Sequence, residues 1–464
     1  MKIKINEIGA IKEARIDLSK KLSVFGGPNG TGKTYLAYVL YAITNEKNKS
    51  IGIPFPENEK KTLLDKNSVE VALDFSKIWN FRQMEVEKIK QNLWTLFAVP
   101  ESKAADFFRN TKISIAETGE DFVERINEIK ISFGLNLLDY SFSIEKNANT
   151  NVVTIKINGD VIKNNDLLQI IDIVLMSKIY SFFAFYPVTS STIFPVERNS
   201  IYTFINELSV KKNEAFDNIQ ILANKKEYNL FDMFKRKTRY PQPIKDGLDV
   251  AEQLDIVQKR NSEFYMFAEE IEMSLLKGKV IITRETNEVQ FVSDRAKSRK
   301  LSFHQSSSIV KTLASLVIYL KHNAVKNDLI IIDEPELNLH PDNQILLTRI
   351  FAKLINNGLR MIVSTHSDYI IREFNNLVML SNEKKELQEL AIKYGYETDE
   401  KINPNDIGVY YFDYPSKTAK QLIVKQIKLD ISGFDFDSIG KAIENQNYIS
   451  EELYYALKYE GDDE

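Results

Sequence analysis

The feature that most constrains this chain is a glycine-rich octapeptide near its start, GPNGTGKT at 27–34. It matches G-x-x-x-x-G-K-[ST] at every fixed position, follows the apolar segment LSVFG at 22–26, and precedes an unbroken helical pattern at 34–42. A strand, a glycine turn and a helix N-terminus in this order bind phosphate, because backbone N–H groups and the helix dipole face the anion. A chance glycine-rich turn would lack these flanks, so we predict a phosphate-binding loop.

The side chains of this loop suit a nucleotide triphosphate. Lys33 is expected to bind β- and γ-phosphate oxygens, and Thr34 is expected to ligate Mg²⁺. The residues predicted to contact the nucleotide here are Gly27, Pro28, Asn29, Gly30, Thr31, Gly32, Lys33 and Thr34.

A second motif, LIIIDEPELNLH at 329–340, is expected to meet this loop. Its four apolar residues are typical of a strand buried on both faces of a parallel sheet. Two adjacent carboxylates at the end of such a strand are costly unless a cation offsets them. We therefore predict that Asp333 holds Mg²⁺, directly or through water, and that Glu334 polarises an attacking water. The alternative is an acidic pair that caps a helix.

His366 follows another short apolar strand, about thirty residues after Glu334. A lone histidine is usually structural, but this position would let it reach a γ-phosphate and sense it. Only four histidines occur in the sequence, so the rest of the chain has none for a histidine-based nuclease or metal site. They are His304, His322, His340 and His366.

Together these motifs resemble an ABC-type ATPase head of the branch that contains SMC, RecF and OLD-like proteins. EPELNLHPDNQ at 334–344 and STHSDYIIREFNNLV at 364–378 are similar to stand-alone, Septu-like ATPases of bacterial anti-phage operons. The resemblance covers residues 1–75 and 185–425. It implies an α/β fold, a P-loop ATPase head with a mixed or parallel sheet interrupted by a mainly helical insertion. It also implies ATP and Mg²⁺ as cofactors, with Lys33, Glu334 and His366 as catalytic residues.

The resemblance further implies a homodimer, or a higher even homo-oligomer, in which a signature motif from one subunit completes the site of the other. The matching residues are Ser306, Ser307 and Ser308, which depart from LSGGQ because Ser308 stands where glycine is expected. Serine hydroxyls at a helix N-terminus can still bind a γ-phosphate, although slow hydrolysis would follow from weaker binding. The alternative is a plain helix cap.

Two further features each allow a functional and a structural interpretation. Glu197 and Arg198 in FPVERN resemble a motif near the nucleotide, or they form a structural ion pair. A basic, aromatic segment could contact DNA or RNA, or it is a solvated loop. Its residues are Tyr228, Phe234, Lys235, Arg236, Lys237, Arg239 and Tyr240.

The chain divides by pattern into five segments. These are a first ATPase lobe at 1–75, a mixed helical insertion at 76–184, the rest of that lobe with a helical and hairpin insertion at 185–300, a second lobe at 301–425, and an acidic tail at 426–464. We expect one long helix over Val250–Leu276 and two short helices in the tail. The most apolar stretch, Leu167–Val196, is expected to be a buried core segment and not a membrane span.

Composition bounds the function further. There is no cysteine, which excludes disulfides and fits a reducing compartment, and the start MKIKINEIG does not resemble a signal peptide. We expect a cytoplasmic protein without a membrane partner. The net charge of −4 gives no global basic field.

The favoured function is an ATPase that dimerises on ATP and regulates a separate effector, a nuclease or toxin, in anti-phage defence. A DNA-repair or chromosome-maintenance ATPase and a scaffold that uses ATP structurally remain alternatives. The missing LSGGQ and the large insertion argue against a transporter.

Overall fold

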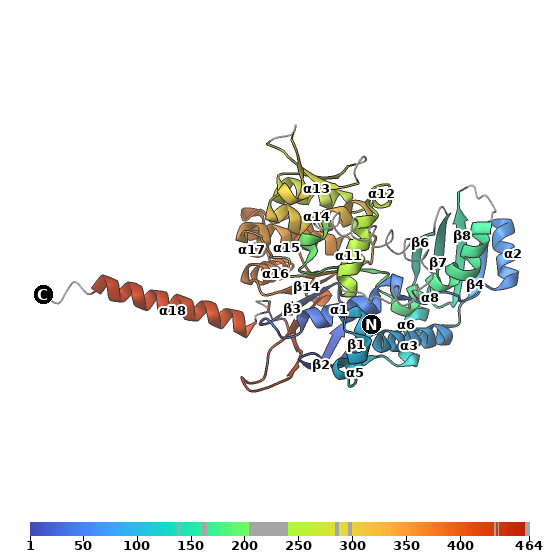
Figure 1. The fold of residues 1–464 in the computed structure, drawn as a ribbon, viewed down its shortest axis with the longest axis horizontal. Helices are drawn as coiled ribbons and strands as arrows, with labels where there is room; N and C mark the ends of the chain where they lie inside the picture. The colour runs from blue at the N-terminus through green and yellow to red at the C-terminus, as the bar shows by residue number, and fades with distance from the viewer. Residues whose placement is uncertain are drawn as a thin grey trace, which may run out of the picture.

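A six-stranded sheet forms the centre of the molecule (Figure 1). The computed structural model describes residues 1–137, 140–159, 165–203, 240–283, 287–295, 299–430, 433–434 and 436–459. The strands of this sheet, in spatial order, are β17 (Lys425–Ile427), β15 (Ile407–Tyr411), β3 (Leu22–Gly26), β14 (Arg360–Thr365), β13 (Leu329–Asp333) and β9 (Ser191–Phe194). All neighbouring pairs are parallel except β15 with β17.

The register of β3, β14 and β13 brings distant motifs to one edge. Gly26 pairs with Thr365, and Ser364 pairs with Asp333. The carboxyl ends of these parallel strands therefore lie side by side, which is where α/β sheets place ligand sites. Every residue of β13 is buried, which confirms the prediction of a strand covered on both faces.

Alternation along each strand divides the core into two clusters, one on each face of the sheet. In β13, Leu329 and Ile331 belong to one cluster, whereas Ile330 and Ile332 belong to the other. Because successive side chains point to opposite faces, a continuous apolar run is the pattern that both layers require.

Helices cover the two faces. On one side α1 (Lys33–Thr44) packs on β13, β14 and β9. The other cluster contains residues of α13 (Tyr265–Ile271), η4 (Glu272–Leu276), α14 (Ser308–His322), α15 (Pro341–Asn356) and α16 (Asp368–Met379). The remaining helices of this half are α11 (Gln242–Glu252), α12 (Leu254–Val257) and α17 (Lys385–Lys393).

Three antiparallel or mixed sheets flank the centre. The first is β16 (Leu422–Ile423), β2 (Ile11–Asp17), β1 (Lys2–Ile8) and β5 (Lys112–Ile115). The second joins β4 (Ser68–Ala72), which precedes the insertion, to three strands of the insertion, β8 (Val152–Asn158), β7 (Tyr140–Lys146) and β6 (Ile131–Leu137). The third is β10 (Gly278–Ile282), β11 (Val289–Ser293) and β12 (Lys300–Ser302).

The insertion also carries helices, so it is a mixed layer of helix and sheet. They are α3 (Phe75–Gln91), α4 (Leu93–Leu96), α5 (Ala104–Phe108), α6 (Gly119–Glu128), α7 (Asn165–Gln169), η3 (Ile170–Leu175) and α8 (Met176–Phe185). A further helix, α2 (Glu57–Lys66), directly precedes β4. Among the described residues, one continuous helical stretch, Asn165–Phe185, is long and apolar enough to span a membrane by length and composition alone. Its α8 part packs on α3, and 61% of the most apolar part of the stretch is buried.

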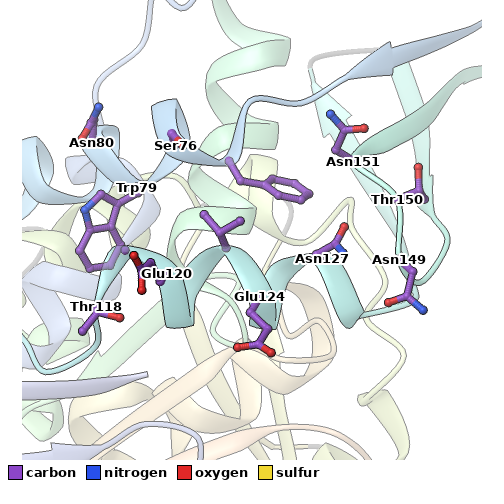
Figure 2. A pocket seen from close by; sticks show the side chains of 13 residues that line it. Ser76, Trp79, Asn80, Thr118, Glu120, Glu124, Asn127, Asn149, Thr150 and Asn151 are labelled. Carbon is purple, nitrogen blue, oxygen red and sulfur yellow. The ribbon is translucent and has the colours of Figure 1, made fainter.

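A hollow of about 1140 Å³ opens between α3, α6 and the β7–β8 turn (Figure 2). Trp79 and Asn80 line it from α3, Glu120 and Glu124 line it from α6, and the turn contributes residues 149–151. None of the predicted nucleotide-site residues lines this hollow.

Two helix predictions are wrong. The helix expected over Val250–Leu276 is broken between α12 and α13, where Ser262 bonds to another part of the chain. Its N–H donates to Lys321 O at 3.0 Å and its hydroxyl donates to Ala324 O at 2.6 Å. The tail forms one helix, α18 (Asp437–Tyr459), in place of two short ones. Figure 1 shows α18 projecting away from the rest of the chain.

A buried ion pair anchors the insertion. Arg82 is fully buried, and its guanidinium lies 4.3 Å from the ring centroids of both Trp79 and Phe122. One of its nitrogens donates to Glu117 at 2.8 Å, and Arg125 bonds to the same carboxylate at 2.7 Å. Burial lowers the pKa of Arg82 to about 10 while the carboxylate opposes that shift. Glu117 therefore offsets a charge that would otherwise lie unpaired in the core.

We predict that Glu117→Ala lowers the free energy of unfolding by about 3 kcal/mol or more, because removing one partner leaves a buried charge uncompensated. Urea unfolding followed by circular dichroism measures this. The matched control is Glu145→Ala, which breaks an exposed pair with Lys156 and should cost less than about 1 kcal/mol. Equal losses for the two variants would contradict the assignment.

Candidate functional site

The glycine loop 27–34 wraps around its own lysine. The Lys33 ammonium donates to Gly27 O at 2.7 Å and to Pro28 O at 2.8 Å, and the Thr31 hydroxyl donates to Pro28 O at 2.8 Å. Gly27 has φ 139°, and a Cβ there would lie 2.1 Å from Phe412 O. A side chain at this position would therefore collide with neighbouring backbone, so glycine is required.

The helix after the loop begins without a side-chain cap. α1 begins at Lys33, and its N-cap, Gly32, has a left-handed backbone and no side-chain cap. There is no acidic residue in the first turn. Unpaired N–H groups and an unneutralised dipole at this end favour an anion.

Thr34 and Asp333 join the two motifs directly. The Thr34 hydroxyl donates to Asp333 Oδ2 at 2.6 Å across 299 residues of sequence. Asp333 is buried, as the last residue of β13. A hydroxyl and a carboxylate in contact are a hard oxygen donor set of the kind that Mg²⁺ prefers, so the residues present fit the predicted metal.

The turn after Asp333 is held by Arg198. The guanidinium donates to Asp333 O at 2.6 Å and to Glu334 O at 2.7 Å, and also bonds to Pro195 O. Glu334 has φ 48°, a left-handed conformation that costs about 1 kcal/mol in a non-glycine residue. Its N–H donates to Ser364 O at 2.9 Å. These bonds hold the Glu334 carboxylate at the sheet edge despite the strained backbone.

His366 lies directly after β14, beside the turn formed by residues 333–336, which we call the acid turn. Its Nδ1 lies 3.8 Å from Glu334 Oε1 and 3.4 Å from Glu336 Oε1. Its side chain is 44% exposed. The structure therefore brings Lys33, Thr34, Asp333, Glu334 and His366 to one place.

Burial and the neighbouring carboxylates have opposite effects on the pKa values of the two cations at this edge. Burial lowers the pKa of Lys33, whereas Asp333, Glu334 and Glu336 act to raise it. Burial likewise lowers the pKa of Arg198 to about 10, against the pull of the same carboxylates. The site thus combines two buried cations with an acidic turn.

The three signature serines lie elsewhere. Ser306 is buried and its hydroxyl bonds to Ser302 O, whereas Ser307 and Ser308 are exposed at the N-terminus of α14. Ser307 is the N-cap, but its side chain makes no capping hydrogen bond. Among the described residues, no hydrogen bond links these serines to the Lys33–Asp333 cluster, so their role in trans stays a prediction.

The predicted nucleic-acid segment cannot be placed. Its residues at 228–239 lie outside the described part of the chain, and only exposed Tyr240 lies within it.

Sequence reasoning missed Glu336 and left Arg198 undecided. Arg198 does not pair with Glu197 in any ion pair among the described residues; it binds the backbone of the acid turn. Glu336 stands three residues beyond Asp333, close to His366. A third acid in DEPE was the available signal, but only the fold shows that it is buried.

Comparisons with known proteins agree with this geometry. The sequence matches the family described as AAA ATPase domain over residues 1–371. No curated protein sequence matches the chain.

Solved structures that match this chain include SMC heads. The SMC head domain from Thermotoga maritima is 11% identical, with a TM-score of 0.33 over 92% of this chain and 98% of that one. An SMC head bound to the C-terminal winged-helix domain of ScpA is 13% identical, with a TM-score of 0.36 over 92% and 97%. An SMC head with an extended coiled coil, bound to a ScpA domain from Pyrococcus furiosus, is 12% identical, with a TM-score of 0.33 over 97% and 98%.

The expected α/β fold with a phosphate-binding loop is confirmed, and because the match covers most of the sequence, this chain belongs to the AAA ATPase domain family.

Proposed function

We propose that this protein binds Mg²⁺–ATP between the glycine loop and the acid turn and hydrolyses it. The contact of 2.6 Å between Thr34 and Asp333 carries this proposal, because it joins a phosphate-binding loop to an acidic strand end. The bare helix terminus of α1 supplies further donors for phosphate oxygens.

Each side chain has a distinct task in this proposal. Lys33 exchanges its bonds to the loop carbonyls for bonds to β- and γ-phosphate oxygens. Glu334 orients the attacking water, and His366 contacts the γ-phosphate from the loop that directly follows β14. Arg198 keeps the Glu334 backbone in its left-handed turn.

Thr34 and Asp333 would hold the magnesium ion. When bound, this ion neutralises charge that develops on the phosphate oxygens. The protein's own contribution is positional and electrostatic, since the donors lie in place before the reaction.

Two copies are proposed to close over two nucleotides. Ser307 and Ser308 are exposed at the start of a helix of 15 residues, with no capping hydrogen bond to satisfy its N-terminus. An anion supplied by a second subunit would meet these free donors. Nucleotide state would then control how tightly the two subunits associate.

We further propose that this ATPase controls a separate effector protein in anti-phage defence. This part of the proposal rests on the resemblance of residues 334–344 and 364–378 to defence ATPases. The projecting helix α18 supports a protein partner. Ile449, Leu453 and Leu457 lie on one face of it and are 41%, 62% and 80% exposed. An apolar stripe exposed on an amphipathic helix is a common mode of protein recognition.

Lys33→Ala should abolish ATP binding, because it removes the ammonium that neutralises the phosphates. Isothermal titration calorimetry with Mg²⁺–ATP measures the loss. Lys146→Ala is the matched control, since its ammonium also bonds to backbone carbonyls, of Asn127 and Ile129, but within the insertion. Unchanged affinity in Lys33→Ala would contradict the proposal.

Glu334→Gln should bind ATP and accumulate as an ATP-bound dimer, because the amide cannot polarise water. Sedimentation velocity at saturating Mg²⁺–ATP measures the dimer. Glu389→Gln, an exposed change on α17, is expected to behave as the unmodified protein. A Glu334→Gln protein that stays monomeric would count against ATP-driven dimerisation.

Joint replacement of Leu453 and Leu457 by Glu should leave ATP turnover unchanged and abolish co-purification with an effector encoded by the adjacent gene. Co-expression of the two chains tests this, with Glu451→Gln on the same helix as the control. Retained co-purification would remove α18 as the contact. Stimulation of turnover by DNA ends, without such a partner, would assign the chain to repair instead.

A further inference from the structure

Glu336 lies buried beneath the predicted reaction site. Its Oε1 accepts the Thr365 hydroxyl at 2.8 Å and the His366 backbone N–H at 2.9 Å. The same oxygen lies 3.4 Å from Nδ1 of the His366 ring. Glu336 therefore contacts both the backbone and the imidazole edge of His366.

The second oxygen of Glu336 has no hydrogen-bond partner among the described residues. Oε2 is buried and accepts no hydrogen bond in the described part of the chain. A buried carboxylate oxygen left unpaired is costly. Glu373, a buried glutamate with a structural role, differs on this point. One of its oxygens accepts from Arg349, and the other accepts from Asn376 and Tyr396.

We propose that Glu336 is a positioning residue for His366, an inference that rests on the ATPase function proposed above. Its carboxylate accepts the Nδ1–H of the imidazole and turns Nε2 toward the nucleotide. A carboxylate can only accept, so the nitrogen that faces it must carry the proton, and the tautomer of His366 is set accordingly.

This arrangement also separates the roles of the two glutamates. Nδ1 of His366 is nearer to Glu336 Oε1, at 3.4 Å, than to Glu334 Oε1, at 3.8 Å. With its proton engaged by Glu336, His366 does not occupy the Glu334 carboxylate. Glu334 remains free to orient water. The distance of 3.4 Å is of the kind that shortens when a substrate fills a site.

Backbone hydrogen bonds hold the turn that carries Glu336. Leu337 N–H donates to Glu334 O, and Leu339 N–H donates to Glu336 O at 3.0 Å. Thr365 is itself fully buried at the end of β14. The carboxylate is thus fixed from two neighbouring strands, which is what orienting a ring requires.

The test compares the unmodified protein with Glu336→Gln, His366→Ala, the double variant and the control Glu373→Gln. Steady-state hydrolysis gives kcat and KM, and calorimetry gives the affinity for Mg²⁺–ATP. We expect Glu336→Gln to lose about tenfold or more in kcat with affinity changed less than about twofold. The double variant should be no slower than His366→Ala alone, because the two substitutions disable the same function.

Two kinetic results would overturn the inference. One is a kcat for Glu336→Gln close to that of Glu373→Gln. The other is a loss in the double variant equal to the product of the single losses. Should Glu336→Gln fail to fold, Glu336→Asp keeps the charge but withdraws it from the ring, and the same loss of kcat at constant affinity is expected.

A spectroscopic measurement separates this inference from the ATPase proposal. The chain has only four histidines, so ¹⁵N imidazole resonances can be assigned to His366 from the spectrum of His366→Ala. We expect the Nδ1–H tautomer in the unmodified protein and a shift toward Nε2–H in Glu336→Gln, with no change in Glu373→Gln. If ATP is not hydrolysed, the proposed function fails. An Nε2–H tautomer in the unmodified protein would contradict the positioning role of Glu336 itself.

Discussion

The hydrogen bond between Thr34 and Asp333 is the interaction on which the rest of the site depends. It spans 2.6 Å in space and 299 residues in sequence, and it forms only because β3 and β13 lie on either side of β14 in parallel register. Parallel pairing places all three carboxyl ends at one edge. A shift by one residue would reverse the faces of the strand and move Asp333 away from the loop.

Hydrophobic patterning explains why this register is secure. The apolar run of β13 supplies side chains to both core clusters, so a slip would exchange the two layers at once. The acidic pair begins where that run ends. Burial of the strand therefore determines the position of its carboxylates, and Arg198 then holds the turn through two backbone carbonyls.

The parts of the site that were predictable from sequence are those that belong to short, contiguous sequence motifs. The loop at 27–34, the acid strand end and His366 each follow an apolar strand, and the structure gathers them at one edge. The parts that were not predictable depend on contacts distant in sequence. Ser262 interrupts an otherwise helical segment because it bonds to Lys321 and Ala324. Glu336 was overlooked because spacing alone does not reveal burial.

The chain passes from the insertion back into the central sheet through β9, and this short connection has a consequence. β9 pairs directly with β13, and Arg198 follows a few residues later. Only residues 186–190 separate α8 from this strand, which is too short a connection to act as a slack tether. The short connection therefore couples the position of the insertion's apolar helix to that of β9 and of Arg198, whose guanidinium bonds to the backbone of the acid turn.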